Sequence, residues 1–215
     1  MAAQVHGILL AAGESRRMGY PKPLLTIDSR TFVAHISDTI LKVVPRLSVV
    51  VGAYGDQVRA ALPDDARITV VENPDYRRGQ LSSLQRAIAA IEPECSAALV
   101  HLCDHPMVRA ETFRLVVRVW AETATPIVIA RYRGRRGHPV IFARELFGEL
   151  MSADDVRGAK AVVEADSSRV RYVDVDDPGI VADLDTPADL AQAGLGKPRG
   201  PDDEARPGGR GPGRR

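Results

Sequence analysis

The fold is decided near the start of the chain, where residues 8–23 read ILLAAGESRRMGYPKP. The apolar run Val5–Leu10 predicts a buried strand, and the small residues after it allow a tight turn. Two glycines then bracket a Ser-Arg-Arg sequence, and Lys22 follows a proline. Backbone N–H groups of such a turn can hold phosphate oxygens, while arginine and lysine neutralise their charge. We therefore expect a nucleoside triphosphate to bind at the carboxyl end of a first β-strand.

This stretch differs from the two common phosphate-binding motifs. It contains neither the Gly-x-Gly-x-x-Gly fingerprint of dinucleotide-binding proteins nor the Gly-Lys-Ser/Thr of a Walker loop. The missing fingerprint argues against a nicotinamide-dependent oxidoreductase on a similar sheet. An ordinary surface loop is the alternative, but strand, turn, paired arginines and Lys22 occur together, which favours phosphate binding.

Length and composition indicate a globular protein. The 215 residues suffice for one domain with a sizeable core, and 45% are hydrophobic against 27% charged. No apolar run approaches the roughly 20 residues of a membrane span, and the N-terminus does not read as a secretory signal. Only Cys95 and Cys103 occur, too few for a disulfide framework or a zinc site, which suits a reducing cytoplasm.

Charge is distributed unevenly between the body of the chain and its end. From Gly196 onward six Lys/Arg face three Asp/Glu, so this tail carries +3 and the rest −2, which sum to the net +1. A near-neutral body argues against duplex nucleic acid as a partner. We expect residues 1–195 to form one domain. The Gly/Pro/Arg-rich residues 196–215 are expected to be disordered, as a solvated tail rather than a polyanion-binding one.

Short Val/Ile-rich runs alternate with segments whose apolar residues lie three and four apart. Strands are expected at 5–10, 47–51, 68–72, 97–101, 127–132, 139–142 and 170–175. Helices are expected at 31–43, 57–62, 81–91, 111–123 and 186–193, and a hairpin turn at 133–137. This alternation predicts parallel βαβ units with right-handed crossovers. The fold class is therefore a single-domain three-layer α/β/α sandwich around a mostly parallel, Rossmann-like sheet.

Five motifs carry a resemblance to a known family. In chain order they read LAAGESRRMGYPK (10–22), GQLSSL (79–84), CDHP (103–106), GHPVIF (137–142) and DLDTPADL (183–190). The chain resembles the nucleotidyltransferases that make nucleoside diphosphate-linked compounds, and within them most the molybdenum cofactor cytidylyltransferases and their relatives. The resemblance spans about residues 5–193, the whole expected domain. Each later motif is weak by itself, whereas five in the correct order are specific.

The resemblance implies a nucleotide site built from the first two motifs. Arg17 would hold the leaving pyrophosphate and Lys22 would stabilise charge at the α-phosphate. The Ala-Ala-Gly of the first motif is similar to that of relatives that use CTP, whereas relatives that use GTP have Gly-Gly. Ser82 has capping of a helix as its alternative role. The expected nucleotide-binding residues are Leu10, Ala11, Ala12, Gly13, Ser15, Arg16, Arg17, Lys22, Gly79, Ser82 and Ser83.

Two aspartates are candidates for a metal site. Asp104 follows the expected strand 97–101, where open α/β sheets place their ligands, and its carboxylate can hold Mg²⁺. Asp104 could instead cap a helix that begins near Arg109, and Asp185 could cap the final helix. The resemblance assigns both carboxylates to Mg²⁺, with Asp183 in reserve. Where this chain has Cys103 the family usually has glycine, a departure that could narrow the site.

The fourth motif is expected beside the acceptor substrate. The resemblance places His138 there, although a histidine after a turn is often structural. Arg136 belongs to a basic cluster with Arg133 and Arg135 that suits an acceptor phosphate or, alternatively, forms a solvated turn. His101 and His105 are left out of the metal site because Mg²⁺ prefers oxygen.

The reaction implied is Mg²⁺-dependent transfer of CMP from CTP to the phosphate of a molybdopterin-type cofactor, with release of pyrophosphate. A molybdenum hydroxylase is the implied partner, and neither nucleic acid nor a membrane is expected. Two alternatives remain. One is the same chemistry, guanylyl or cytidylyl transfer, on a sugar or polyol phosphate. The other is a non-catalytic carrier of molybdenum cofactor.

Overall fold

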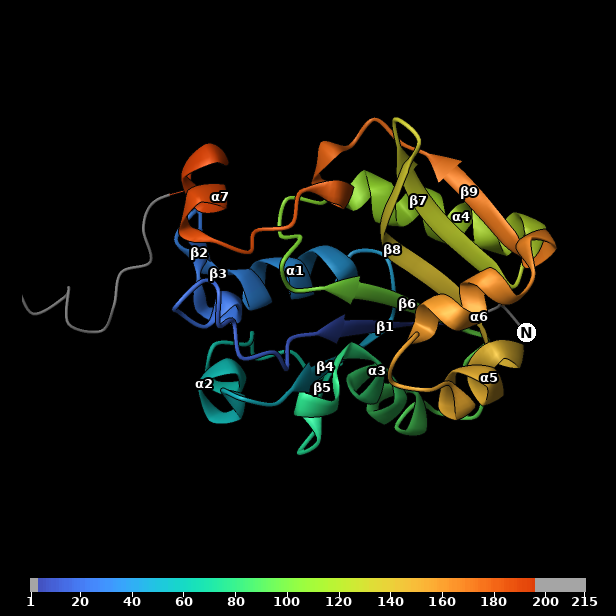
Figure 1. Cartoon of the computed structure of the whole chain (residues 1–215), viewed down its shortest axis with the longest axis horizontal. Helices are drawn as coiled ribbons and strands as arrows, with labels where there is room; N and C mark the ends of the chain where they lie inside the picture. The colour runs from blue at the N-terminus through green and yellow to red at the C-terminus, as the bar shows by residue number, and fades with distance from the viewer. Residues whose placement is uncertain (1–3, 196–215) are drawn as a thin grey trace, which may run out of the picture.

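The computed structural model describes residues 4–195 and consists of one large sheet covered by helices on both sides (Figure 1). The strands of the large sheet are β1 Val5–Leu10, β4 Arg46–Val51, β5 Ile68–Glu72, β6 Ala97–Leu102, β7 Ile127–Tyr132, β8 Arg135–Ala143 and β9 Val170–Asp174. A separate small sheet pairs β2 Thr26–Ile27 with β3 Arg30–Thr31.

The helices connect these strands and close the chain. They are α1 Phe32–Leu41, α2 Gly55–Ala60, α3 Gln80–Ala89, α4 Ala110–Thr123, α5 Phe147–Ser152, α6 Ala159–Ala165 and α7 Pro187–Gln192. Short 3₁₀ turns are η1 Lys22–Leu24, η2 Tyr76–Arg78, η3 Arg144–Leu146, η4 Ser167–Arg169 and η5 Pro178–Val181. None of the helices between residues 4 and 195 combines the length and the apolarity that crossing a bilayer requires.

The order of the strands indicates where a ligand would bind to this sheet. The large sheet runs β5-β4-β1-β6-β8-β7-β9, with β8 antiparallel to both neighbours and all other pairs parallel. From β1 the chain moves outward to β4 and β5, then returns to the other side of β1 to form β6. Strand order therefore reverses between β1 and β6, and ligands of such sheets bind beyond the carboxyl ends at that point.

Two apolar cores sandwich the sheet, because successive side chains of a strand face opposite sides. Leu9 of β1 belongs to the core that includes Phe32 of α1 and Phe113 of α4. Its neighbour Ile8 belongs to the core that includes Leu84 of α3. Figure 1 shows α3 and α4 on opposite sides of the sheet. Phe32 and Phe113 are buried, so truncating either to alanine would cost about 3–5 kcal/mol. The three-layer, mostly parallel fold class is confirmed.

Sequence-based boundaries hold to within one residue at six strands, whereas β8 begins four residues before the expected 139–142 and the ends of the helices shift by up to two residues. The turn expected over 133–137 is wrong for its second half. Only Arg133 and Gly134 turn, both with positive φ, while Arg135 and Arg136 already pair with β7. Ladder hydrogen bonds to β7 override the polar, glycine-containing composition of this stretch. The helices α5 and α6 were not expected at all, and the predicted tail, 196–215, lies outside the described residues.

Candidate active site

The loop after β1 is held close to the end of β4. The carbonyl oxygen of Ala12 accepts a hydrogen bond of 3.1 Å from the backbone N–H of Ala53. Gly52, which precedes Ala53, permits this contact, since a β-carbon on Gly52 would lie 2.7 Å from the Ala12 oxygen. The loop is therefore anchored to the sheet before it reaches its polar residues.

A tight turn then directs Lys22 into the site. Ser15 has a positive φ of 52°, and its carbonyl oxygen accepts from the N–H groups of Met18 (3.0 Å) and Gly19 (3.1 Å). The Ser15 hydroxyl accepts from the backbone N–H of Lys22 at 2.9 Å. Ser15 thus shapes the loop that carries Lys22, a structural role alongside the nucleotide contact expected of it.

Lys22, Asp104 and Asp185 converge in what we term the carboxylate cluster. The Lys22 Nζ donates to Asp104 Oδ2 at 3.0 Å and to Asp185 Oδ1 at 2.7 Å. The exposed fractions of these three side chains lie between 16% and 23%. Arg17 completes the arrangement, because its Nη2 lies 2.6 Å from Asp185 Oδ2. Residues that lie 82 and 163 positions from Lys22 in the chain therefore share one ammonium group.

Charge pairing outweighs burial at Lys22 and at Asp104. Burial alone would lower the pKa of Lys22, but the two carboxylates outweigh it and raise that pKa above its ordinary value. Burial would likewise raise the pKa of Asp104, but the Lys22 charge and hydrogen bond hold it below the ordinary value. Two cations thus face two carboxylates.

The donor set suits a divalent cation of the Mg²⁺ type. Asp104 Oδ1 is buried and has no hydrogen-bond partner, so this oxygen is free to coordinate a metal ion. Between residues 4 and 195 no group of three or more His, Cys, Asp and Glu side chains could hold a metal by itself. One or two carboxylates, completed by water and substrate phosphates, are the usual protein contribution to Mg²⁺ binding. Asp104 has a free oxygen for such a site, and Asp185 lies beside it with its two oxygens paired to Lys22 and Arg17.

Helix capping does not occupy Asp104. The N-cap of α4 is Arg109, whose side chain forms no cap hydrogen bond, and a distant carboxylate contacts this helix start instead. Asp177 Oδ2 accepts from the Arg109 N–H at 2.9 Å and from the Thr112 hydroxyl at 2.6 Å. This buried carboxylate anchors the start of α4, a role that the sequence-based reading did not detect.

Capping does not occupy Asp185 either. Thr186 is the N-cap of α7, and it forms a reciprocal capping box with Asp189. Asp185 therefore keeps both carboxylate oxygens for Lys22 and Arg17. Asp183, the residue held in reserve for the metal site, instead lines the larger of the two cavities that are described below.

Close packing brings the two aspartates together. The backbone N–H of Leu184 donates to the carbonyl oxygen of Asp104 at 2.9 Å, joining the two segments directly. Upstream, a β-carbon at Gly137 would lie 1.9 Å from the carbonyl oxygen of Ile180. Glycine at this position of the fourth motif therefore allows η5 to pack closely on β8. Because η5 ends four residues before Asp185, this packing helps to fix the position of Asp185.

A cavity of about 230 Å³ lies beside the first loop. It is lined by most of the expected nucleotide residues, namely Leu10, Ala11, Ala12, Gly13, Ser15, Lys22, Gly79 and Ser83, and by Asp104. It is also lined by residues that sequence reasoning missed, including Tyr76, Gln80 and Leu102. Tyr76 and Leu102 carried no motif signal, whereas Gln80 belongs to the second motif and could have been chosen.

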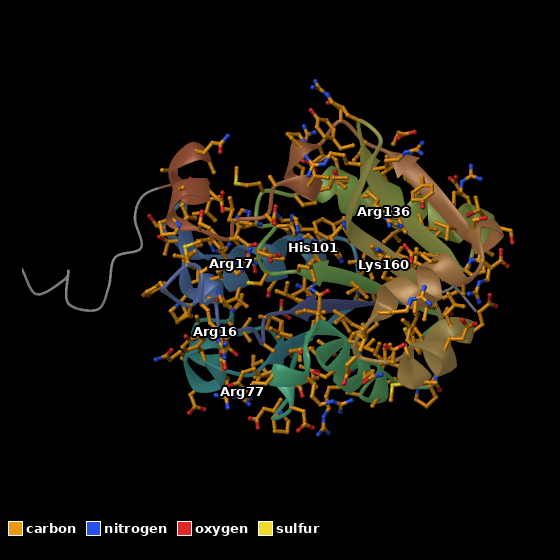
Figure 2. The ribbon with its side chains drawn as sticks, in the orientation of Figure 1. Arg16, Arg17, Arg77, His101, Arg136 and Lys160 are labelled. Carbon is orange, nitrogen blue, oxygen red and sulfur yellow. The ribbon has the colours of Figure 1, made fainter. Side chains whose placement is uncertain are left out.

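Three expected nucleotide residues do not line this cavity. Ser82 is buried, where its hydroxyl accepts from Asn73 Nδ2 at 2.9 Å and donates to the Gly79 carbonyl at 2.8 Å. Arg16 pairs with Glu14 and is 80% exposed. Arg17 is engaged with Asp185. Figure 2 shows Arg16 and Arg77 on the side of α2, and the hydrogen bonds of both to Glu14 lower the pKa of that carboxyl to about 2.

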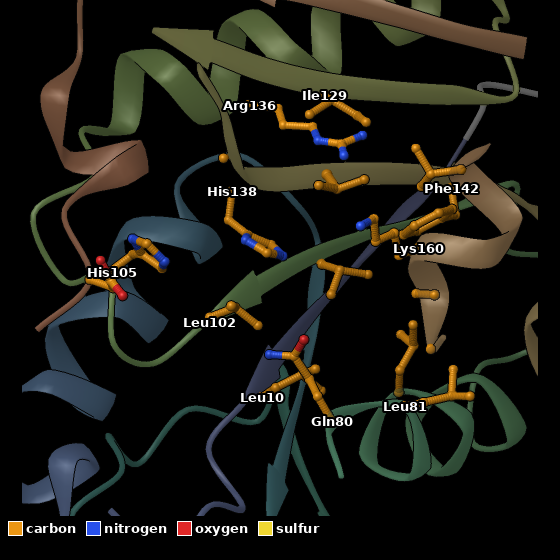
Figure 3. A pocket seen from close by; sticks show the side chains of 18 of the residues that line it. Leu10, Gln80, Leu81, Leu102, His105, Ile129, Arg136, His138, Phe142 and Lys160 are labelled. Atoms are coloured by element: carbon orange, nitrogen blue, oxygen red, sulfur yellow. The ribbon is translucent and has the colours of Figure 1, made fainter. Parts of the chain in front are cut away.

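A larger cavity, of about 550 Å³, adjoins the smaller one and is lined from β1 and α3 across β6 to β7 and β8 (Figure 3). It includes both residues expected at the acceptor, His138 and Arg136. The two cavities share Leu10, Gln80 and Leu102 in their walls. They are therefore neighbours at the carboxyl ends of β1 and β6.

Three histidines lie close together near the end of β6, where His105 and His138 line the larger cavity and the buried His101 ring packs edge-on against Phe113 of α4. The ring centroid of His101 lies 6.3 Å from that of His105 and 6.4 Å from that of His138. His101 Nε2 lies 3.1 Å from the backbone carbonyl oxygen of His105. Burial lowers the pKa of His101 well below its ordinary value and lowers that of His138 to about 4. Both imidazoles are neutral at physiological pH, so His138 offers a polar contact rather than a positive charge.

Cys103 is packed rather than reactive. It is buried and lines the smaller cavity, and its backbone N–H donates to the Leu10 carbonyl at 3.1 Å. Burial raises the pKa of its thiol far above the ordinary value, which keeps it protonated. The side chain present in place of the usual glycine is accommodated without displacing Asp104 from Lys22.

Residues 7–171 match the family described as the MobA-like NTP transferase domain, and the chain belongs to this family. The resemblance carried by the five motifs is thereby confirmed. The protein is a nucleotidyltransferase of the MobA-like type.

Relatives of known name refine this placement. The chain is 27% identical over 187 residues to the molybdenum cofactor cytidylyltransferase of Escherichia coli K12, covering 86% of this chain and 93% of that protein. Among solved structures, Rv0371c from Mycobacterium tuberculosis H37Rv is 31% identical with a TM-score of 0.79, covering 90% of this chain and 98% of that one. A structure of Rv0371C in complex with manganese is 32% identical with a TM-score of 0.70, covering 89% and 98%.

Proposed function

We propose that this nucleotidyltransferase transfers CMP from CTP to the phosphate of a molybdopterin-type acceptor, using Mg²⁺ and releasing pyrophosphate. One observation carries the proposal: the carboxylate cluster adjoins two neighbouring cavities. Asp104 lines the smaller cavity, and its neighbour His105 lines the larger. A two-substrate transfer needs a nucleotide and an acceptor on either side of one centre of charge neutralisation.

The chain's own residues bind and align the reactants. The first loop and Gly79 would hold the triphosphate, with Lys22 at the α-phosphate and Arg17 at the departing pyrophosphate. An oxygen of the acceptor phosphate attacks the α-phosphorus in line, and the bond from that phosphorus to the oxygen of pyrophosphate breaks. The attacking oxygen is already ionised, so no general base is required, which accords with neutral His101 and His138.

Asp104 and Asp185 would hold the metal. When bound there, Mg²⁺ supplies charge neutralisation for the phosphate oxygens of both substrates. The buried, unpartnered Asp104 Oδ1 supports this assignment. The manganese complex of the relative Rv0371C is consistent with a divalent metal in this fold.

CTP is favoured by the walls of the smaller cavity. Ala11 and Ala12 are buried and line this cavity. Because the hydrogen bond to Ala53 anchors the loop, their β-carbons limit the width of the cavity. A pyrimidine needs less room there than a purine. The name of the Escherichia coli relative, a cytidylyltransferase, supports the same choice.

The test is pyrophosphate release with Mg²⁺, each of the four common NTPs and molybdopterin as acceptor. We expect release with CTP alone, abolished in Asp104→Ala and retained in Asp38→Asn, a control carboxylate on α1. Release with GTP would overturn the choice of CTP. Release with a sugar or polyol phosphate in place of molybdopterin would overturn the acceptor. No release with any nucleotide, together with tight cofactor binding, would indicate a carrier.

A further inference from the structure

Three cations gather around one carboxylate at the larger cavity. Arg136, Arg157 and Lys160 each approach Glu164 to 3.5 Å. We term these four residues the cationic rim. The three cations line the cavity, and they come from β8, from the segment before α6 and from α6 itself. Neither Arg157 nor Lys160 belongs to the five motifs, and neither has a role in the function proposed above.

The rim carries surplus positive charge. Burial would raise the pKa of Glu164, but Lys160 and Arg136 hold it below the ordinary value, so this carboxylate is ionised. Three positive charges against one negative charge leave +2. Contacts of 3.5 Å are longer than good N–H···O hydrogen bonds, so one shared carboxylate does not satisfy the donors of three cations.

An ordinary surface ion pair does not explain this convergence. Lys160 and Glu164 are four residues apart on α6, and that spacing alone accounts for their pairing. Arg136 and Arg157 reach the same carboxylate from outside the helix. In Figure 3 the Arg136 and Lys160 side chains extend into the cavity from opposite sides.

An apolar wall lies between the rim and the carboxylate cluster. Leu81, Val140 and Phe142 line the same cavity, whereas His105 and His138 line it toward Asp104 (Figure 3). A ligand that fills this space meets polar groups near Asp104, apolar side chains along its middle and positive charge at the rim. The cavity therefore offers polar groups at one end and positive charge at the other.

We propose that the cationic rim is a second anion subsite, which binds an anionic group of the acceptor other than its reacting phosphate. This rests on the proposed function, since it takes the larger cavity as the acceptor site. The acceptor class is a ring system that carries a second anionic group besides the reacting phosphate. Lys160 and Arg157 are then specificity residues, which select such acceptors over those whose phosphate is the only anionic group.

Two fluorescent probes test the subsite without turnover. Naphthyl phosphate carries one anionic end, and a carboxynaphthyl phosphate adds a carboxylate on the second ring. In fluorescence titrations of the whole protein with Mg²⁺, we expect the second probe to bind about tenfold more tightly, as a charge-assisted contact would give. Lys160→Gln should lower that ratio, although Arg136 and Arg157 remain at the rim, while leaving the affinity for naphthyl phosphate unchanged.

Two further variants separate binding from a structural role. Glu164→Gln removes the competing carboxylate and should increase the ratio, whereas loss of a merely structural ion pair would not. Arg118→Gln on α4 removes an exposed cation that pairs only within its own helix, and it should leave the ratio unchanged. Lys160 is 65% exposed, so its replacement does not threaten folding.

The outcomes are distinct from those of the nucleotidyl-transfer assay. A ratio near one in the unaltered protein, or a ratio that Lys160→Gln does not change, would overturn the anion subsite even if CTP turnover proceeds. Failure of both probes to bind would overturn the larger cavity as an acceptor site and the subsite with it. Absence of turnover with an intact tenfold ratio would overturn the reaction and keep the subsite.

Discussion

The carboxylate cluster and the cationic rim adjoin the same cavity system but differ in contact and exposure. In the cluster, Lys22 meets its partners at 2.7 and 3.0 Å, and the side chains are 16% to 23% exposed. In the rim every contact to Glu164 is 3.5 Å, and exposure rises to between 37% and 65%. Preorganised charges in a partly dry site act strongly on a transition state, whereas solvated charges are screened. This difference supports the chemical role proposed for the cluster and the binding role proposed for the rim.

The largest effect is expected from removing the ammonium of the cluster. Lys22→Met keeps the aliphatic stem but deletes the charge at the α-phosphate, and we expect kcat to fall on the order of 10²–10³-fold. Steady-state pyrophosphate release with CTP measures this. Lys42→Met, which replaces the lysine directly after α1, serves as the control. Near-normal turnover would show that Lys22 has no role in the transition state.

The same substitution should lower stability in a defined pH range. The pKa of Asp104 is depressed in the fold, so its pairing stabilises above pH 3.8 and is lost as pH falls through the folded value. The pKa of Lys22 is raised, so its contribution is complete below pH 10.5 and is lost as pH rises through the folded value.

Lys22→Met should therefore cost about 1–3 kcal/mol of unfolding free energy at neutral pH. The difference from the unaltered protein should shrink toward both extremes of pH. Urea titrations from about pH 2 to about pH 12 would measure it, and a difference that stays constant over that range would contradict ionic pairing in the cluster.

A smaller, differently distributed effect is expected at the rim. Lys160→Gln should raise KM for the acceptor about tenfold and leave kcat unchanged, because an exposed binding charge does not act on the reacting atoms. Acceptor titrations at saturating CTP measure the two constants separately. A fall in kcat with an unchanged KM would place Lys160 in the chemistry instead.

The smallest effect is expected at Arg16. Its side chain is 80% exposed and pairs with Glu14, so Arg16→Gln should raise KM for CTP by no more than about threefold. Arg17→Gln, which frees Asp185, should cost more. Equal losses in the two variants, measured in parallel CTP titrations, would show that both arginines reach the triphosphate.

Local pattern was enough for the parallel strands and the longer helices. Runs such as Val5–Leu10 and Ile127–Tyr132 are apolar and β-branched, so their boundaries follow from composition alone. The short helices α5 and α6 lack a long periodic face, which is why they escaped notice. The turn expected over 133–137 failed because pairing with β7 outweighs local preference.

For the candidate site, too, local sequence identified some residues and misjudged others. Motifs identified Lys22, Asp104 and Asp185, and the structure places them in contact. Ser82 also matched a motif, but its side chain turns into the protein toward Asn73. Spacing along a helix start does not tell which hydroxyl faces solvent, since burial depends on what packs against the helix.

By itself the sequence determined the alternation of strands and helices, the loop expected to bind phosphate and the two candidate carboxylates, because each is encoded in contiguous residues. Only the tertiary structure decided that Lys22 joins Asp104 to Asp185, that Asp177 anchors the start of α4, and that Arg136, Arg157 and Lys160 meet at Glu164. These contacts link segments tens of residues apart. They depend on strand order and on the close approach of backbones at Gly52 and Gly137, which no local pattern encodes.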